Sequence, residues 1–183
     1  MASAMWDFEN CSVLVYTEDG GFVAEGMVVE HDRNDMSVVI SHPLSDIRQG
    51  VRVNLLIIHS GGASEFLGTA RKTVGSTREI TLFNHRHRTG RTSTRHQVNT
   101  PAMVRHLLVN GEMQPLAEPI EVLVVNISTT GALLKCKEGS FSVGMVMEIS
   151  LKIGDNDTIL YGTVVRDNPC ADGNCDYGCQ FIA

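Results

Sequence analysis

The stretch Val122-Leu-Val-Val-Asn-Ile-Ser-Thr-Thr-Gly-Ala-Leu-Leu134 decides how the second half of this chain is expected to fold. Two apolar, β-rich runs flank Asn126-Ile-Ser128-Thr-Thr-Gly131, whose residue types are common in Asx and ST turns at strand ends. Asn126 and Ser128 supply neutral hydrogen-bonding groups, and Gly131 permits a positive φ or a close backbone approach. The stretch therefore predicts two strands joined by a polar turn.

An arginine-rich segment upstream contains the second informative motif, Arg91-Thr-Ser-Thr-Arg95. Between Asn84 and His106 there are five arginines and no acid, although the whole chain has 15 Lys+Arg and 21 Asp+Glu. Guanidinium groups bind phosphate oxygens and the O6/N7 edge of guanine in a bidentate manner. The segment therefore suits a phosphorylated purine ligand. Its arginines are Arg86, Arg88, Arg91, Arg95 and Arg105.

The two motifs, in this order, resemble those of the PilZ family, whose members are receptors for the bacterial second messenger cyclic di-GMP. The family pattern is Arg-x-x-x-Arg on the approach to the domain, then Asp or Asn-x-Ser-x-x-Gly between early strands. Val98-Asn-Thr-Pro-Ala-Met-Val104 is similar to the first strand of the family, and Tyr177-Gly-Cys-Gln-Phe-Ile182 to the closing strand. The resemblance covers about residues 88–183.

The resemblance implies a cyclic di-GMP site formed by both motifs. Alone, linker arginines are commonly a solvated charge run and Asn-x-Ser a strand-ending turn, but their joint occurrence favours a binding site. Many family members have a further arginine where this chain has Gly90, so we expect one cyclic di-GMP per protomer. The predicted ligand-binding residues are Arg91, Arg95, Asn126, Ser128 and Gly131, with Arg88 and Arg166 as weaker candidates.

Short β-rich runs broken by Gly, Asn and Asp dominate the chain, and no apolar stripe with helical spacing is present. We predict an all-β fold of two small antiparallel β-barrels in tandem: an N-terminal barrel at 1–84, an arginine-rich linker at 85–98 and a PilZ domain at 99–183. This layout resembles the flagellar-brake proteins. The predicted strands are 11–16, 22–29, 36–40, 51–58, 65–72, 78–83, 101–108, 121–125, 132–136, 145–153, 159–165 and 175–182.

Composition limits the possible functions. The net charge of −6 argues against a general nucleic-acid binder, so we expect no DNA partner. The chain has no stretch of 18 apolar residues and no signal-peptide pattern, which favours a cytoplasmic protein without a membrane span. Cys170, Cys175 and Cys179 form the only cysteine cluster, and without an obvious fourth ligand we interpret them as turn and strand residues rather than a zinc site.

No catalytic motif is recognisable, so we expect a receptor without a cofactor rather than an enzyme. The resemblance implies that cyclic di-GMP changes the orientation of the two domains and acts through a protein partner, for example in flagellar or polysaccharide-export machinery. One alternative is a small barrel that binds single-stranded nucleic acid. Such sites usually stack bases on aromatic side chains, and the absence of Phe, Tyr and Trp between Asn84 and Leu108 argues against this alternative. Another is a PilZ-like adaptor that binds no ligand.

Overall fold

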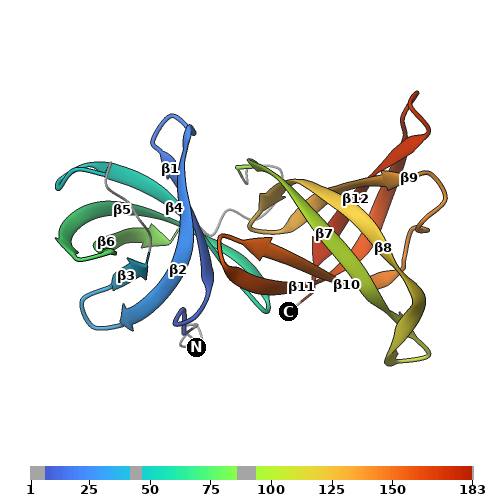
Figure 1. Ribbon diagram of the computed structural model, residues 1–183, viewed down its shortest axis with the longest axis horizontal. Coiled ribbons are helices and arrows are strands. Elements are labelled where there is room, and N and C mark those ends of the chain that lie inside the picture. Colours follow the sequence, from blue (N-terminus) through green and yellow to red (C-terminus); the bar gives the residue numbers. More distant parts are fainter. Residues whose placement is uncertain (1–6, 42–46, 86–93, 183) are drawn as a thin grey trace. The chain divides into compact units, whose positions relative to one another are not determined.

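The computed structural model describes residues 7–41, 47–85 and 94–182, and in these ranges every regular element is a β-strand. The strands form two closed antiparallel barrels of six strands each (Figure 1). The chain divides into two compact units, which contain the two barrels. The prediction of an all-β protein with two small barrels is therefore confirmed. No helix that could cross a membrane occurs among the described residues.

The first barrel closes in the strand order β1-β2-β3-β6-β5-β4. Apolar side chains on alternate positions fill its interior, and Val28, Ile40, Ile57 and Ile80 are completely shielded from solvent. Burial of each such side chain stabilises the fold by about 1.5–3 kcal/mol. The strands are β1 (Ser12–Thr17), β2 (Phe22–Asp32), β3 (Ser37–Ser41), β4 (Arg52–His59), β5 (Gly62–Val74) and β6 (Thr77–His85).

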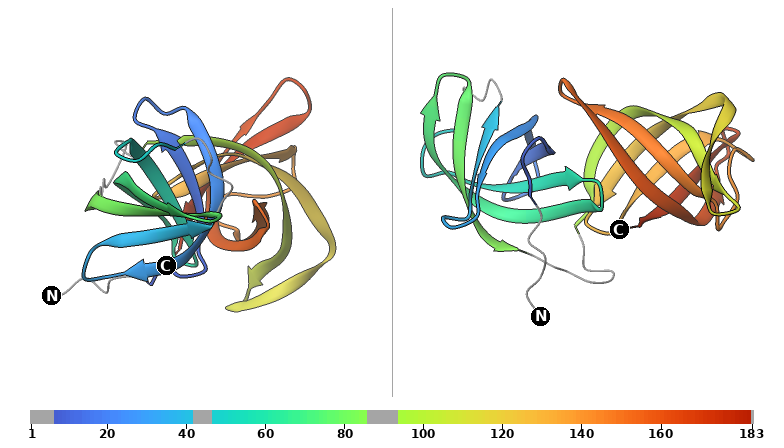
Figure 2. Two further views of the ribbon diagram at one scale, coloured as in Figure 1. Left: turned by 60° about the vertical axis from the view of Figure 1, so that its left-hand side comes forward. Right: turned by 90° about the horizontal axis from the view of Figure 1, so that it is seen from below.

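The second barrel closes in the order β10-β11-β12-β9-β8-β7, and Figure 2 shows its strands wrapping around a common interior. Val104, Val124, Leu134, Ile149 and Val164 are fully buried inside it. Because side chains alternate along a strand, their neighbours face outward and form the outer surface. The strands are β7 (His96–Val109), β8 (Glu112–Ser128), β9 (Gly131–Lys137), β10 (Val146–Ile153), β11 (Asn156–Pro169) and β12 (Asn174–Phe181).

The hairpin of β7 and β8 is much longer than the sequence analysis predicts. Asn110 and Gly111 both have positive φ, 54° and 86°, as a two-residue hairpin turn with right-handed twist requires. The prediction ended the first strand at Leu108 and missed residues 112–120, because Pro115, Pro119 and the glutamates there have low strand propensity. The Asn-Gly dipeptide is the local signal that identifies this hairpin.

The predicted linker, 85–98, is longer than the gap between the observed strands. Strand β6 continues through His85, and β7 already begins at His96. The arginines at 86, 88 and 91 lie outside the described residues, so of the predicted Arg-x-x-x-Arg motif the structure describes only Arg95.

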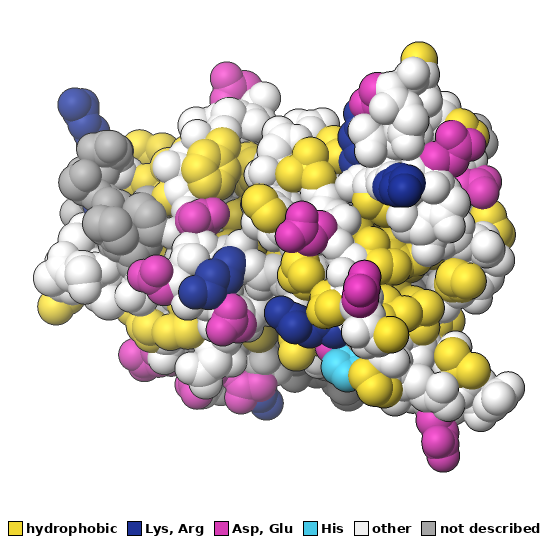
Figure 3. Space-filling model, turned by 45° about the vertical axis from the view of Figure 1, so that its right-hand side comes forward, with side chains coloured by type: hydrophobic (Ala, Val, Ile, Leu, Met, Phe, Trp, Pro, Cys, Tyr) yellow, Lys and Arg dark blue, Asp and Glu magenta, His cyan; other side chains and the backbone are white. Residues whose placement is uncertain are grey.

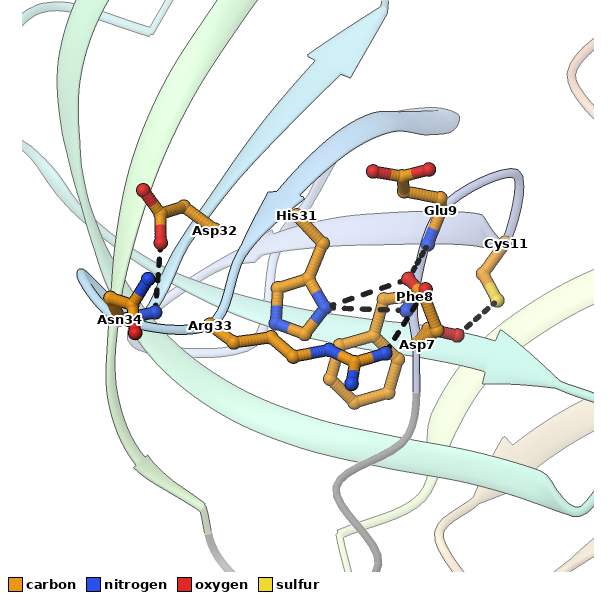
Figure 4. A network of polar contacts seen from close by, with 8 residues as sticks. All are labelled: Asp7, Phe8, Glu9, Cys11, His31, Asp32, Arg33 and Asn34. Atoms are coloured by element: carbon orange, nitrogen blue, oxygen red, sulfur yellow. Dashed lines mark hydrogen bonds and ion pairs between the residues drawn. The ribbon is translucent and has the colours of Figure 1, made fainter.

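A polar network joins the segment before β1 to the end of β2 and the turn that follows it (Figure 4). The Phe8 backbone N–H donates to Nδ1 of His31 at 3.4 Å, and Asp7 lies 3.9 Å from the same nitrogen. Asp7 also pairs with Arg33 at 3.0 Å. The Phe8 ring packs on His31 and, edge-on, on Phe66. The buried ring of His31 thereby connects the segment before β1 to the end of β2.

Burial of the His31 ring lowers its pKa, and the nearby carboxylate of Asp7 only partly opposes this effect. Its Nε2 is buried and has no hydrogen-bond partner among the described residues, so a charged ring would be poorly solvated. Glu9 and Asp32 also favour the charged ring, whereas Arg33 disfavours it. The balance leaves His31 neutral in the native state at neutral pH.

We therefore expect acid to destabilise this barrel through His31. Below the unfolded pKa of about 6.5, the unfolded chain binds a proton that the native state does not, so stability falls as pH decreases. Chemical denaturation at about pH 7.5 and about pH 5.5 should show a larger loss in the wild type than in His31→Gln. Equal losses in the two proteins would contradict a neutral, buried His31.

Candidate ligand-binding site

A hollow of about 350 Å³ opens on the outer face of the second barrel, over β8, β9, β11 and β12. Every described residue that the sequence analysis assigned to the ligand site lines it. No Asp or Glu is among the lining residues that the structure describes. These are Arg95, Asn126, Ser128, Thr130, Gly131, Ala132, Leu133, Val165, Arg166, Gly178, Cys179 and Gln180.

A β-bulge in β8 brings Asn126 to the outer face. Val124 pairs with Leu134 and Asn126 with Leu133, so Val125 is an extra residue on β8. Strict alternation from the buried Val124 would place Asn126 inside the barrel. The bulge lets Asn126 line the hollow instead, and Ile127 takes the inward position with no exposed surface.

A second bulge acts in the same way on β11. Val164 pairs with Cys179 and Arg166 with Gly178, so Val165 is the extra residue. Val164 is fully buried, and alternation alone would direct Arg166 to the core. With the bulge, Val165 and Arg166 are both exposed, and both line the hollow. Arg166, a weaker candidate in the sequence analysis, therefore lines the same hollow as the other predicted ligand-binding residues that the structure describes.

Strand register aligns four residues of the hollow across four strands. Asn126 on β8 pairs with Leu133 on β9, Leu133 with Gly178 on β12, and Gly178 with Arg166 on β11. We call these four residues the cross-strand row. It connects Asn126 to an arginine 40 positions later in the sequence, which no local pattern indicates. Leu133 and Gly178 were not predicted as site residues.

Ser128 forms the turn that ends β8. Its Oγ donates to the Gly131 carbonyl at 3.2 Å and accepts from the Thr130 N–H at 3.4 Å. These bonds close the turn between β8 and β9, as an ST turn does. Ser128 thus has a structural role in the hairpin, and its position in the hollow also leaves it near any bound ligand.

Gly131 is needed for close backbone approach and not for a positive φ. It is absent from the glycines with positive φ, which decides between the two possibilities that the sequence left open. A Cβ at this position would lie 2.1 Å from the backbone oxygen of Cys179, a sterically impossible contact. The absence of a side chain therefore lets β9 and β12 meet at the edge of the hollow.

The polar groups of the hollow are available to a ligand. Arg95 and Arg166 are exposed, and neither forms an ion pair with a described residue. The side chain of Asn126 is only 9% exposed, yet it makes no hydrogen bond to a described residue. Two guanidinium groups without a described ion-pair partner lie beside the Asn126 amide, and no described lining residue is an acid, so the hollow suits an anionic, hydrogen-bonding ligand.

A larger hollow of about 850 Å³ lies on the same barrel, over β7, β8, β10 and β11. Arg105, Lys135 and Lys152 line it, but so do Glu121 and Asp157, and it contains none of the predicted site residues. Figure 3 shows charges of both signs among hydrophobic side chains on the surface of the protein. Mixed charge suits a phosphorylated ligand less well than the acid-free hollow does.

Three of the four cysteines of the second barrel are buried. Cys175 and Cys179 are buried, and Cys175 pairs across the strands with the buried Cys136. Burial raises the pKa of the Cys179 thiol to about 12, so that it stays protonated and unreactive. Cys170, which precedes the turn between β11 and β12, is partly exposed. The described residues contain no group of three or more side chains that could hold a metal ion.

Comparison with known families agrees with the architecture and the motifs. Residues 86–183 match the model of the PilZ domain. This chain belongs to the PilZ family. The PilZ domain therefore comprises the second barrel together with the arginine-rich segment in front of it. No curated protein matches the chain significantly.

Several solved structures are similar to this chain. K. pneumonia MrkH in complex with c-di-GMP is 16% identical, with a TM-score of 0.40, over 95% of this chain and 80% of that chain. The Bacillus subtilis inhibitor of motility, MotI/DgrA, is 16% identical with a TM-score of 0.37, over 97% and 90%. Escherichia coli YcgR in complex with c-di-GMP is 11% identical with a TM-score of 0.38, over 94% and 76%.

The PilZ barrel thus brings together Arg95, Asn126, Ser128, Gly131 and Arg166. Arg88 and Arg91 lie outside the described residues, so their place relative to the hollow stays a prediction. The part of these residues in ligand binding is likewise a prediction.

The two glycines of the hollow should respond differently to substitution by alanine. In Gly131→Ala the new methyl group meets the backbone of Cys179, which cannot move without breaking the β9–β12 pairing. We expect a loss of about 1–3 kcal/mol of stability, typical of overpacking. In Gly178→Ala the methyl group meets only the side chain of Arg166, which can move, so stability should be nearly unchanged. Thermal and denaturant unfolding of both variants would measure this contrast, and equal stability of Gly131→Ala and wild type would contradict it.

Proposed function

We propose that this PilZ protein is a receptor for cyclic di-GMP, which binds in the acid-free hollow of the second barrel. The observation that carries the proposal is the convergence of Arg95, Asn126 and Arg166 on one hollow without an acid among its described lining residues. Cyclic di-GMP has two phosphates and two guanines, which match guanidinium forks and an amide in charge and hydrogen bonding. The family to which the chain belongs is one of cyclic di-GMP receptors, which supports the same conclusion.

Within this proposal each residue has a distinct part. Arg91 and Arg95 contact phosphate or a guanine edge from the segment before β7, and Asn126 and Ser128 add neutral hydrogen bonds from β8. Arg166 approaches from β11, on the opposite side of the hollow. Gly131 keeps the end of the hairpin free of a side chain.

The proposed output is a change in the orientation of the two barrels. The Arg-x-x-x-Arg motif lies between β6 and β7, so it belongs to the only covalent connection of the two barrels. A ligand that holds Arg91 and Arg95 against the second barrel restricts this connection. The altered orientation is then recognised by a protein partner, through which the receptor regulates motility, polysaccharide export or another surface behaviour.

Substitution of Arg95 tests the site directly. Arg95→Ala should weaken cyclic di-GMP binding by about 2–4 kcal/mol, the range for truncating one partner of a desolvated charged pair. Asn126→Ala should cost less, about 0.5–1.5 kcal/mol, since it removes neutral hydrogen bonds. Isothermal titration calorimetry with the purified protein measures both.

Arg105→Ala is the matched control, because Arg105 lies on the same barrel but lines the other hollow. The affinity of Arg105→Ala for cyclic di-GMP should equal that of the wild type. GTP and a short single-stranded RNA serve as control ligands. Unchanged binding in Arg95→Ala, or tighter binding of RNA than of cyclic di-GMP, would refute the assignment.

Trypsin digestion tests the engagement of the connecting segment. Bound ligand should slow cutting after Arg91, because its guanidinium would be held by the ligand and not free to enter the protease. Cutting after Lys72, in the first barrel, should not change. If saturating cyclic di-GMP, shown to bind, leaves the rate of cutting after Arg91 unchanged, Arg91 is not part of the site.

A further inference from the structure

Gly178 lies directly beneath the side chain of Arg166. A Cβ on Gly178 would be 2.6 Å from Nε, 2.7 Å from Cγ and 3.1 Å from Cδ of Arg166. Cβ atoms essentially never come within 3.0 Å of another group, so the stem of Arg166 occupies the space that any other residue at position 178 would fill. Gly178 is itself buried, although it lies on the outward-facing cross-strand row.

The conformation of Gly178 does not require glycine. It is not among the residues with positive φ, and it pairs regularly with Leu133 on β9. A residue with a side chain could adopt the same backbone. The feature that glycine provides here is therefore space, and the group that uses this space is Arg166.

The direction of Arg166 follows from this contact. Its stem crosses β12 at Gly178 and lies flat on the sheet, along the cross-strand row that continues to Leu133 and Asn126. An arginine that instead stood upright on β11 would extend into solvent. No described carboxylate pairs with the guanidinium of Arg166, so packing over Gly178 is the restraint that the structure shows.

We propose that Gly178 is a positioning residue for the ligand site: it lets Arg166 lie flat, so that the planar guanidinium forms one wall of the hollow against a guanine base. The inference rests on the proposed function. A restrained guanidinium suits a purine in two ways, since it stacks on the base and its N–H groups match O6 and N7. The exposed part of Leu133, next in the row, adds an apolar surface for the same base.

The central experiment is a double-mutant cycle of Gly178→Ala and Arg166→Ala, with cyclic di-GMP affinity measured by calorimetry. We expect each single variant to lose at least about tenfold in affinity, with melting temperatures close to that of the wild type. The double variant should bind no more weakly than Arg166→Ala, because Gly178 acts only through Arg166. The inference would be overturned if the fold-losses in cyclic di-GMP affinity of the two single variants multiplied in the double variant. Wild-type affinity in Gly178→Ala would overturn it too.

A ligand-free measurement separates this inference from the proposed function. In the free wild-type protein, the Nε–H group of Arg166 should show the NMR relaxation of an ordered group, unlike that of the exposed Arg48. In Gly178→Ala the Nε–H group of Arg166 should become as mobile as that of Arg48. A mobile Arg166 in the wild type overturns the positioning role even if cyclic di-GMP binds. If Arg166 is ordered but the protein binds no cyclic di-GMP, the proposed function is refuted. The proposal that Gly178 positions Arg166 against a guanine base is then refuted as well.

Discussion

Two β-bulges of the second barrel, at Val125 and Val165, are the constraint on which the candidate site depends. A barrel strand must direct alternate residues to the core, and a polar residue in such a position would be buried without partners at a cost of several kcal/mol. The extra residues Val125 and Val165 each shift the alternation by one position. Asn126 thereby lines the hollow and Arg166 reaches the surface, while Val124, Ile127 and Val164 remain in the core.

Two glycines line the hollow, and the absence of a side chain has a different use at each. Gly131 allows two strands to approach, and Gly178 allows a side chain to lie on the sheet. The first use affects stability and the second affects the direction of a neighbouring group. A single residue type thus serves packing in one strand and the shape of the site in the next.

The charge of the hollow is opposite to that of the whole chain. The protein has a net charge of −6, whereas the described lining of the hollow contains Arg95 and Arg166 and no acid. At physiological ionic strength the Debye length is about 8 Å, so the local arginines determine the potential within the hollow. The charge of the hollow is therefore set locally, in contrast to the negative charge of the chain as a whole.

Much of this protein is determined by sequence patterns that act over a few residues. Turn residues between β-rich runs predict the two barrels, and the motif ending in Gly131 predicts the polar hairpin turn, since neighbouring residues alone decide whether a turn can form. Alternation fails at Asn126 because a bulge depends on the partner strand. The long hairpin beyond Leu108 was missed because low strand propensity at Pro115 is overridden by pairing with β7.

Only the tertiary structure decides which residues share the hollow. No sequence motif places Arg166 and Gly178 in one site with Leu133 and Asn126, because this arrangement follows from the register of β8, β9, β12 and β11. Register is set by the simultaneous closure of the barrel and burial of its core, in which a shift of one residue would expose every apolar side chain of a strand. The sequence by itself determines the chemistry of the candidate site, and the closed barrel determines its geometry, because pairing between distant strands is a property of the whole fold.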